Sequence, residues 1–264
     1  MSDTLARLRQ RLDRIGPAPR DDKTIRRIPL GCAQIDAALD GGLAAGLLHE
    51  ALAAGGNDGP AAAGFAAALA QRTGKAPVVW VRQRFGEAEA GELHAPGLAA
   101  MGALDPAHLT LVHARHPRDL LAAGLEAARC PALGAVVLEA WGNSSLLDLT
   151  ATRRLMLAAE ASAVTTILLR VASEGARSVA FTRWQVGAAP SRALAADAPG
   201  LATFDITLLR NRAGPSGQRW RVEWDHGQQR FRPAAPIPRR VVPLPQRRPA
   251  VAPDAHPSPL ARTG

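Results

Sequence analysis

The sequence predicts an α/β fold in which a mostly parallel sheet is flanked by helices and is followed by antiparallel strands. Three observations predict it. Short apolar segments alternate with helix-like segments through residues 47–171. Beyond about residue 177, strand-like segments follow one another without helices between them. An apolar content of 47% in 264 residues is enough for one large core.

The first part of the chain has strands that are apolar on both faces, which is typical of a parallel sheet covered by helices. Helix-like segments separate them, and one begins with Pro117, a residue favoured in the first turn of a helix. We expect strands at residues 47–53, 77–83, 109–113, 134–140 and 164–171, and helices at 61–72, 117–129 and 147–161.

The later part predicts strands at residues 179–186, 203–210 and 218–224. Residues 211–217 contain Asn, Gly, Pro and Ser, which favour a turn, so we expect an antiparallel hairpin around them. Alternation would place Trp220, Val222 and Trp224 on one face of the last strand. We expect Trp184, Trp220 and Trp224 to pack in the core rather than to stack on DNA bases.

The net charge of +9 lies at the two ends of the chain. Residues 1–27 carry a net +4 and residues 226–264 a net +6, whereas residues 28–225 carry −1. We therefore expect a basic amphipathic helix and linker over 1–27, a folded core over 28–225 and a disordered Pro/Arg-rich tail over 226–264. The basic ends hint at contact with a polyanion, although an Arg-rich composition is also typical of GC-rich genomes.

The N-terminal helix has a narrow apolar seam formed by Leu5, Leu8, Leu12 and Ile15. Such a seam suits docking on a partner, and packing on its own domain is an equally open interpretation. No apolar run is long enough for a membrane span, and Cys32 and Cys130 lack a metal-ligand spacing. We expect a reduced, cytoplasmic protein without a metal site.

A glycine-rich loop follows the first predicted strand. The run Gly-Gly-Leu-Ala-Ala-Gly-Leu-Leu-His-Glu at residues 41–50 leads into this strand and resembles the start of the RecA-like ATPase core. A working phosphate loop needs Gly-x4-Gly-Lys-Ser/Thr, in which Lys neutralises phosphate and the hydroxyl holds Mg²⁺. No Lys occurs between Gly31 and Gly74, and Asp58 adds a negative charge. The degenerate loop consists of Gly55, Gly56, Asn57, Asp58, Gly59 and Pro60.

Two other ATPase positions are also altered. The fourth strand ends in Glu139, where RecA-like ATPases have an Asp that orders the metal. The second strand runs into Arg82, Gln83 and Arg84, which cannot replace the carboxylate that activates water. We expect the nearby Glu87, Glu89 and Glu92 to lie in a solvated loop. We expect no catalytic residues, no bound cofactor and no enzymatic activity.

Within the RecA-like superfamily the chain resembles the ImuA-type inducible mutagenesis proteins over about residues 28–224. The resemblance rests on the motifs Ile-Pro-Leu-Gly-Cys-Ala-Gln-Ile-Asp (28–36), Gly-Gly-Leu-x-x-Gly (41–46) and Gly-Glu-Leu-His-Ala-Pro-Gly-Leu (91–98). The most specific motif is Ala-Phe-Thr-Arg-Trp-Gln-Val-Gly-Ala-Ala-Pro-Ser (180–191), followed by Leu-Leu-Arg-Asn-Arg-Ala-Gly-Pro-Ser-Gly (208–217).

The resemblance implies a RecA-like accessory protein of SOS-induced translesion mutagenesis, a pseudo-ATPase with the P-loop NTPase fold. Its implied partners are ImuB, RecA and an error-prone C-family DNA polymerase, with single-stranded DNA and self-association as further options and no membrane contact. Candidate contacts to nucleic acid are the arginines Arg183, Arg210, Arg212, Arg219, Arg239, Arg240, Arg247 and Arg248.

Two alternatives stay open at this point. One is a cell-division inhibitor that resembles SulA, which is also RecA-like and lacks a working phosphate loop. The other is an ATPase with an unorthodox phosphate loop.

Overall fold

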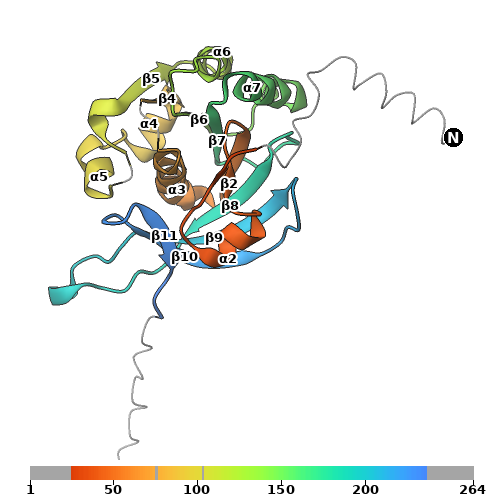
Figure 1. Cartoon of the computed structure of the whole chain (residues 1–264). Coiled ribbons are helices and arrows are strands. Elements are labelled where there is room, and N and C mark those ends of the chain that lie inside the picture. The colour runs from red at the N-terminus through yellow and green to blue at the C-terminus, as the bar shows by residue number, and fades with distance from the viewer. Residues whose placement is uncertain (1–24, 75–76, 103, 237–264) are drawn as a thin grey trace, which may run out of the picture.

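A computed structural model describes residues 25–74, 77–102 and 104–236 of the chain. Its centre is a nine-stranded sheet with the strand order β11-β10-β9-β8-β3-β7-β6-β4-β5 (Figure 1). The strands that run parallel are β3 (Leu48–Ala53), β4 (Val78–Gln83), β5 (Leu109–Ala114), β6 (Ala135–Trp141), β7 (Thr165–Val171) and β8 (Thr182–Ala188). The antiparallel extension consists of β9 (Thr203–Asn211), β10 (Arg219–Asp225) and β11 (Arg230–Pro233). The predicted fold class is confirmed.

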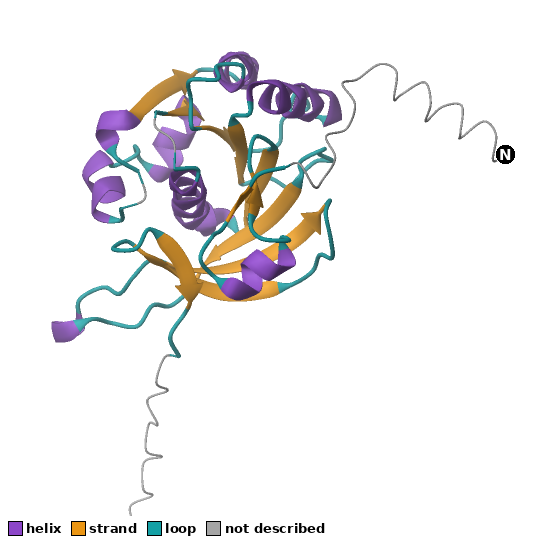
Figure 2. Cartoon of the chain, in the orientation of Figure 1, coloured by secondary structure: helices purple, strands orange, loops and turns teal. Residues whose placement is uncertain are grey.

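Helices cover both faces of the parallel strands (Figure 2). Helix α3 (Gly59–Arg72) packs on one face, and α6 (Pro117–Ala128) and α7 (Leu149–Ser162) pack on the other. The shorter elements are α2 (Ala33–Ala38), α4 (Arg84–Ala90) and α5 (Ala95–Ala100), the 3₁₀ turns η2 (Gly56–Asp58), η3 (Pro106–His108) and η4 (Ala195–Asp197), and a separate pair of strands, β1 (Arg27–Ile28) and β2 (Leu43–Ala44).

The larger core lies between α3 and the sheet. Alanine dominates α3, and its small side chains let the helix approach the strands closely. Phe65 of this helix contacts Trp184, Phe204 and Phe231 at ring-centroid distances of 5.8, 6.1 and 5.4 Å. Trp224 packs against Phe231 at 5.0 Å. Because Trp184 and Trp224 are fully buried and Trp220 is half buried against Trp184, their predicted role in the core is confirmed.

The predicted start of a disordered tail at residue 226 is wrong. Strand β11 pairs with β10, and Phe231 on it is fully buried. Because a single large aromatic side chain anchors a four-residue strand, the apolar pattern is too short to show in the sequence. Residues 1–24 and 237–264 lie outside the described residues, and with them the predicted N-terminal helix and the rest of the tail.

The segment after β4 also differs from the prediction of a solvated loop. It forms the helix α4, which carries Glu89 on its exposed surface, and Glu92 follows in the turn before α5. Helices α2 and α5 were not predicted either. Each of these helices has only six or seven residues, and two turns carry too little periodicity to be recognised.

The parallel strands place their carboxyl ends along one edge of the sheet, where ligands of open α/β folds bind. The loops after β3, β4 and β6 meet there.

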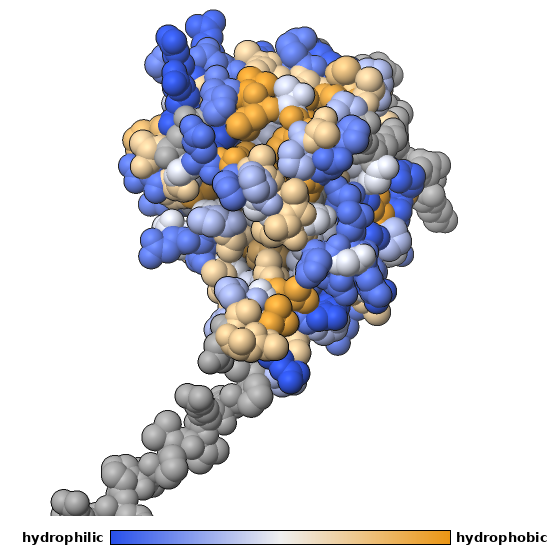
Figure 3. All heavy atoms as spheres, turned by 90° about the vertical axis from the view of Figure 1, so that its left-hand side faces the viewer, coloured by the Kyte–Doolittle hydropathy of each residue, from blue (hydrophilic) through white to orange (hydrophobic). Residues whose placement is uncertain are grey.

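The face of the molecule in Figure 3 shows apolar residues gathered in its upper part among hydrophilic ones. The edge strand β5 contributes the half-buried Leu109, Leu111 and Val112 to the outer surface of the sheet. Within the described ranges, no helix is long and apolar enough to cross a membrane.

Candidate functional site

The glycine-rich loop after β3 occupies the position of a phosphate loop. It is short: a 3₁₀ turn over Gly56–Asp58 leads directly into α3, which begins at Gly59. Pro60 in the first turn has no amide hydrogen, and alanine fills the following three positions. The start of α3 therefore offers backbone amides but no ammonium or hydroxyl group to a phosphate.

Asp58 ties this loop to the neighbouring strand. Its Oδ1 accepts a hydrogen bond of 2.8 Å from the amide of Ala188 at the end of β8. The amide of Ala54 donates to the carbonyl of Val186 at 2.7 Å and holds the start of the loop to the same strand. The carboxylate thus serves as a structural tie, and it also places a negative charge beside the start of α3.

Glu139 on β6 is buried, with 2% of its surface exposed. Its Oε1 accepts from Arg82 Nη2 at 3.1 Å and from Trp141 Nε1 at 2.9 Å, and its Oε2 accepts from Trp80 Nε1 at 2.9 Å. Three protein donors therefore satisfy the side chain at the degenerate metal position. Among the residues that the structure describes, no three His, Cys, Asp or Glu side chains are grouped so that they could hold a metal ion.

Arg82 and Gln83 end β4 beside this carboxylate. Arg82 is buried and also donates from Nη1 to the carbonyl of Gly91 at 3.1 Å. Gln83 accepts through Oε1 from the amide of Trp141 at 2.7 Å. Only Arg84, the first residue of α4, faces solvent. At the position of a water-activating base, Arg82 and Gln83 therefore bind to neighbouring elements of the protein.

The indole of Trp141 lies between the starts of α3 and α4. A Cβ atom built on Gly86 would come within 2.2 Å of Trp141 Nε1, and one built on Gly59 would lie 3.7 Å from Trp141 Cη2. Glycine at position 86 is thus required by the close approach of the ring. Sequence analysis missed this role. The spacing of two residues along one strand, which puts Glu139 and Trp141 on the same face, could have indicated it.

The space that remains beside these groups is a cavity of about 210 Å³. It is bounded by Gly59, Pro60, Arg82, Glu139 and Trp141, and by the turn around Leu93. Arg82 and Glu139 on its wall already form an ion pair at 3.1 Å. The walls thus present a neutralised ion pair and an indole, which do not form the cationic cradle that a triphosphate requires.

A second buried ionic cluster lies on the opposite face of the sheet. Glu50 on β3 is fully buried and contacts Arg170 Nε on β7, and its Oε2 lies 2.6 Å from Arg183 Nε on β8. Arg170 also donates from Nη2 to the carbonyl of Leu147 at 3.1 Å. The side chain of Arg183 is 17% exposed. Arg183, a predicted contact to nucleic acid, pairs with Glu50 in the structure, because a buried carboxylate requires cationic partners.

Of the other candidate arginines, the structure describes Arg210, Arg212 and Arg219. Arg210 is exposed and donates to the carbonyl of Ser178 at 2.6 Å. Arg212 and Arg219 are exposed on either side of the β9–β10 turn. Arg239, Arg240, Arg247 and Arg248, as well as the seam of Leu5, Leu8, Leu12 and Ile15, lie outside the described residues.

The architecture defines a RecA-like protein. In its fold the chain is similar to the RadB recombinase known from a crystal structure, with a TM-score of 0.52 and 13% sequence identity over 79% of this chain and 100% of that one. This likeness shows the fold alone. No family model matches the sequence.

The sequence itself is similar to two curated proteins named ImuA from Caulobacter vibrioides, of strains NA1000/CB15N and ATCC 19089/CB 15. Each is 35% identical over 199 residues, which cover 69% of this chain and 70% of the relative. The chain belongs to the ImuA family.

Proposed function

We propose that this chain is a non-catalytic, cytoplasmic accessory protein of damage-inducible (SOS) translesion mutagenesis. Its membership of the ImuA family carries the proposal. In this role the RecA-like core acts as a rigid scaffold and works through contacts with other proteins.

The geometry of the degenerate site supports the absence of catalysis. Phosphoryl transfer depends on a cation at the phosphates, a metal ion and a positioned water. Here the loop lacks the Lys and the hydroxyl residue, the three donors on Glu139 compete with a metal, and Arg82 replaces the base. These are the positions at which a RecA-like motor would act.

The partners that we propose are ImuB, RecA and an error-prone C-family DNA polymerase, with single-stranded DNA as an additional ligand. The ends of the chain suit partner recognition because they carry the predicted apolar seam of Leu5, Leu8, Leu12 and Ile15 and most of the positive charge. The sequence from residue 28 to residue 225 is nearly neutral, with a net charge of −1.

The test is reconstitution from purified proteins, followed by size-exclusion chromatography. We expect the full chain to co-elute with ImuB, with RecA, or with both. The double substitution Leu8→Asp and Leu12→Asp should abolish this co-elution and leave the melting temperature of the isolated chain unchanged. Leu194→Asp with Leu209→Asp is the matched control, since both leucines are exposed in the folded core. Co-elution with neither partner, together with binding to the cell-division GTPase, would favour the SulA-like alternative instead.

A further inference from the structure

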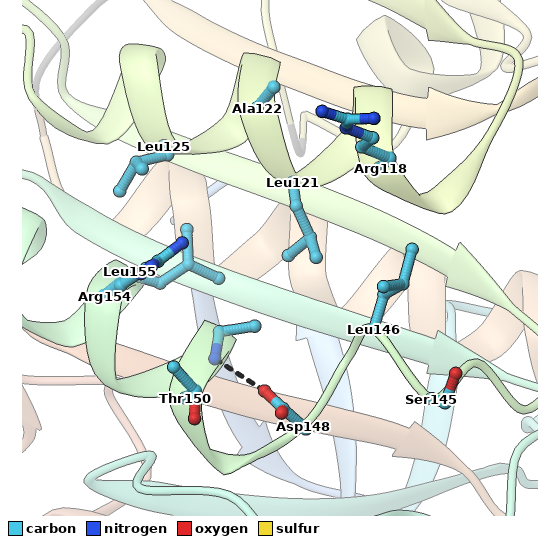
Figure 4. A pocket seen from close by; sticks show the side chains of 11 residues that line it. Arg118, Leu121, Ala122, Leu125, Ser145, Leu146, Asp148, Thr150, Arg154 and Leu155 are labelled. Carbon is cyan, nitrogen blue, oxygen red and sulfur yellow. Dashed lines mark hydrogen bonds between the residues drawn. The ribbon is translucent and has the colours of Figure 1, made fainter.

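An open groove lies between α6 and the start of α7, on the face of the sheet opposite α3 (Figure 4). Its volume is about 480 Å³, which is within the range of ligand-binding clefts. The apolar part of its lining consists mainly of Leu121, Leu125, Leu146 and Leu155. Leu146 is 49% exposed, and Leu121 and Leu125 are half buried. The groove therefore leaves leucine surface in contact with water.

Two arginines flank this surface. Arg118 at the start of α6 and Arg154 on α7 both line the groove, and Figure 4 shows them on opposite sides of Leu121. Among the described residues, neither guanidinium has a carboxylate partner. Asp148, the acidic residue of the lining, caps α7 by accepting from the amide of Ala151 at 2.8 Å. The groove thus combines an apolar floor with two unpaired positive charges.

We propose that this groove binds a segment of a partner protein that carries large apolar side chains flanked by Asp or Glu. Apolar side chains would remove the exposed leucine surface from water, and the carboxylates would pair with Arg118 and Arg154. Contacts of this kind are typical of an amphipathic peptide laid into a hydrophobic groove. The inference rests on the proposed function only in that the chain acts through protein contacts.

The charge of the groove argues against an occupant from this chain. Residues 1–24 carry a net charge of +2 and residues 237–264 a net +4, so both ends would bring like charge to the two arginines. The same holds for the ends of a second copy. The chemistry of the lining also argues against single-stranded nucleic acid, because the lining contains no aromatic side chain on which a base could stack.

The experiment starts with a phage-displayed library of random 16-residue peptides, selected on the full-length chain. Selected peptides are then synthesised with a fluorescent label, and their affinity is measured by anisotropy in 50 mM NaCl. We expect a consensus of Leu, Ile or Phe with at least two acidic residues. Binding should weaken when the salt concentration is raised, because the ion pairs are near the surface.

Variants then locate the binding site. The double charge reversal Arg118→Glu and Arg154→Glu should weaken binding about tenfold or more, and Leu146→Ser should weaken it as well. Arg153→Glu is the matched control, because Arg153 is exposed on the same helix but does not line the groove. Leu209→Ser is the control for the exposed leucine. Both controls should change the affinity less than twofold.

Several outcomes would overturn the proposal: no peptides enriched above background, a consensus without acidic residues, or affinities that the double charge reversal leaves unchanged. Tighter binding by a synthetic peptide of residues 1–16 would assign the groove to the chain's own N-terminus. Displacement of the peptides by a 20-nucleotide oligo-dT would assign it to nucleic acid. Because the peptides are selected without ImuB or RecA, failure here is distinguishable from failure of the proposed function, which the co-elution experiment tests separately.

Discussion

Buried charges at the residue scale have partners of opposite charge on both faces of the sheet. On the α3 side, Arg82 pairs with Glu139 at 3.1 Å, and both side chains are 3% exposed. On the α7 side, Arg170 and Arg183 share Glu50. A buried ion pair is stabilising only while it is complete, since removal of one partner leaves the other charge without compensation. These networks connect β4 with β6, and β3 with β7 and β8.

The first prediction concerns Glu139. Glu139→Ala should lower the free energy of unfolding by about 3 kcal/mol or more, because Arg82 is left buried without its carboxylate. Two indole N–H groups also lose their acceptor. Urea denaturation measures the effect. Glu126→Ala is the control, since its ion pair with Arg129 is exposed and should contribute less than about 0.5 kcal/mol. If both variants lowered the free energy of unfolding equally, the buried ion pair would contribute no more to stability than the exposed one.

His49 lies in a chain of hydrogen bonds that a neutral imidazole satisfies. Trp184 Nε1 donates to Thr182 Oγ1 at 2.8 Å, and Thr182 Oγ1 lies 2.7 Å from His49 Nδ1. His49 Nε2 lies 2.8 Å from the carbonyl of Ala44, which can only accept, so the ring proton is on Nε2. Nδ1 is then left to accept the hydroxyl hydrogen of Thr182. Burial lowers the pKa of His49 from 6.5 to about 4.

The second prediction follows from this pKa. As the pH falls below 6.5, His49 becomes protonated in the unfolded chain. In the folded chain it stays neutral until the pH approaches about 4. The contribution of His49 to stability is therefore present above pH 6.5 and is lost as the pH falls towards 4, by roughly 3 kcal/mol in all. Urea denaturation at pH 7, 5.5 and 4.5 should show a shallower pH dependence for His49→Gln than for the wild type. His116→Gln, at an exposed site, should keep the wild-type slope, and an unchanged slope in His49→Gln would contradict the assignment.

At the scale of elements, the long strands and helices could be predicted and the short ones could not. Strands such as Ala135–Trp141 consist mostly of apolar residues, and helices of 12 to 14 residues show clear boundaries. Helices α2, α4 and α5 are too short to show a period in the sequence, and strand β11 depends on contacts with distant residues. Phe231 on β11, for instance, is held by Phe65 and Trp224.

The candidate site, too, could be predicted only in part. The loss of the phosphate-loop residues is a local property of residues 55–60 and shows in the sequence. The network around Glu139 joins β4 to β6, and sequence spacing does not reveal which donors from another strand will reach a carboxylate.

The third prediction concerns β11. A chain truncated after residue 236 should keep the stability of the full chain. Truncation after residue 226 removes Phe231 from the aromatic core and should prevent stable folding or lower the melting temperature strongly. The single change Phe231→Ala should cost about 3–5 kcal/mol. Circular dichroism during heating measures all three, and equal melting curves for both truncated chains would show that β11 adds nothing to the core.

At the scale of the whole molecule, a nearly neutral core separates two basic ends. The fourth prediction is that DNA binding, where it occurs, is electrostatic and indifferent to sequence. Deletion of residues 237–264 removes five Arg and one Asp, and should weaken binding to oligo-dT and flatten its salt dependence. Filter binding between 50 and 200 mM salt measures both. Unchanged affinity and slope in the truncated chain would place the contact on the folded core.

The fifth prediction addresses the central claim that the RecA-like scaffold acts without nucleotide. Isothermal titration calorimetry of the full chain with ATP and Mg²⁺ tests it most directly. The absent Lys, the carboxylate of Asp58 beside the loop and the indole of Trp141 against Gly59 predict no measurable binding, which corresponds to a Kd above about 1 mM. A micromolar Kd in the presence of Mg²⁺ would contradict the account and would favour an ATPase with an unorthodox phosphate loop.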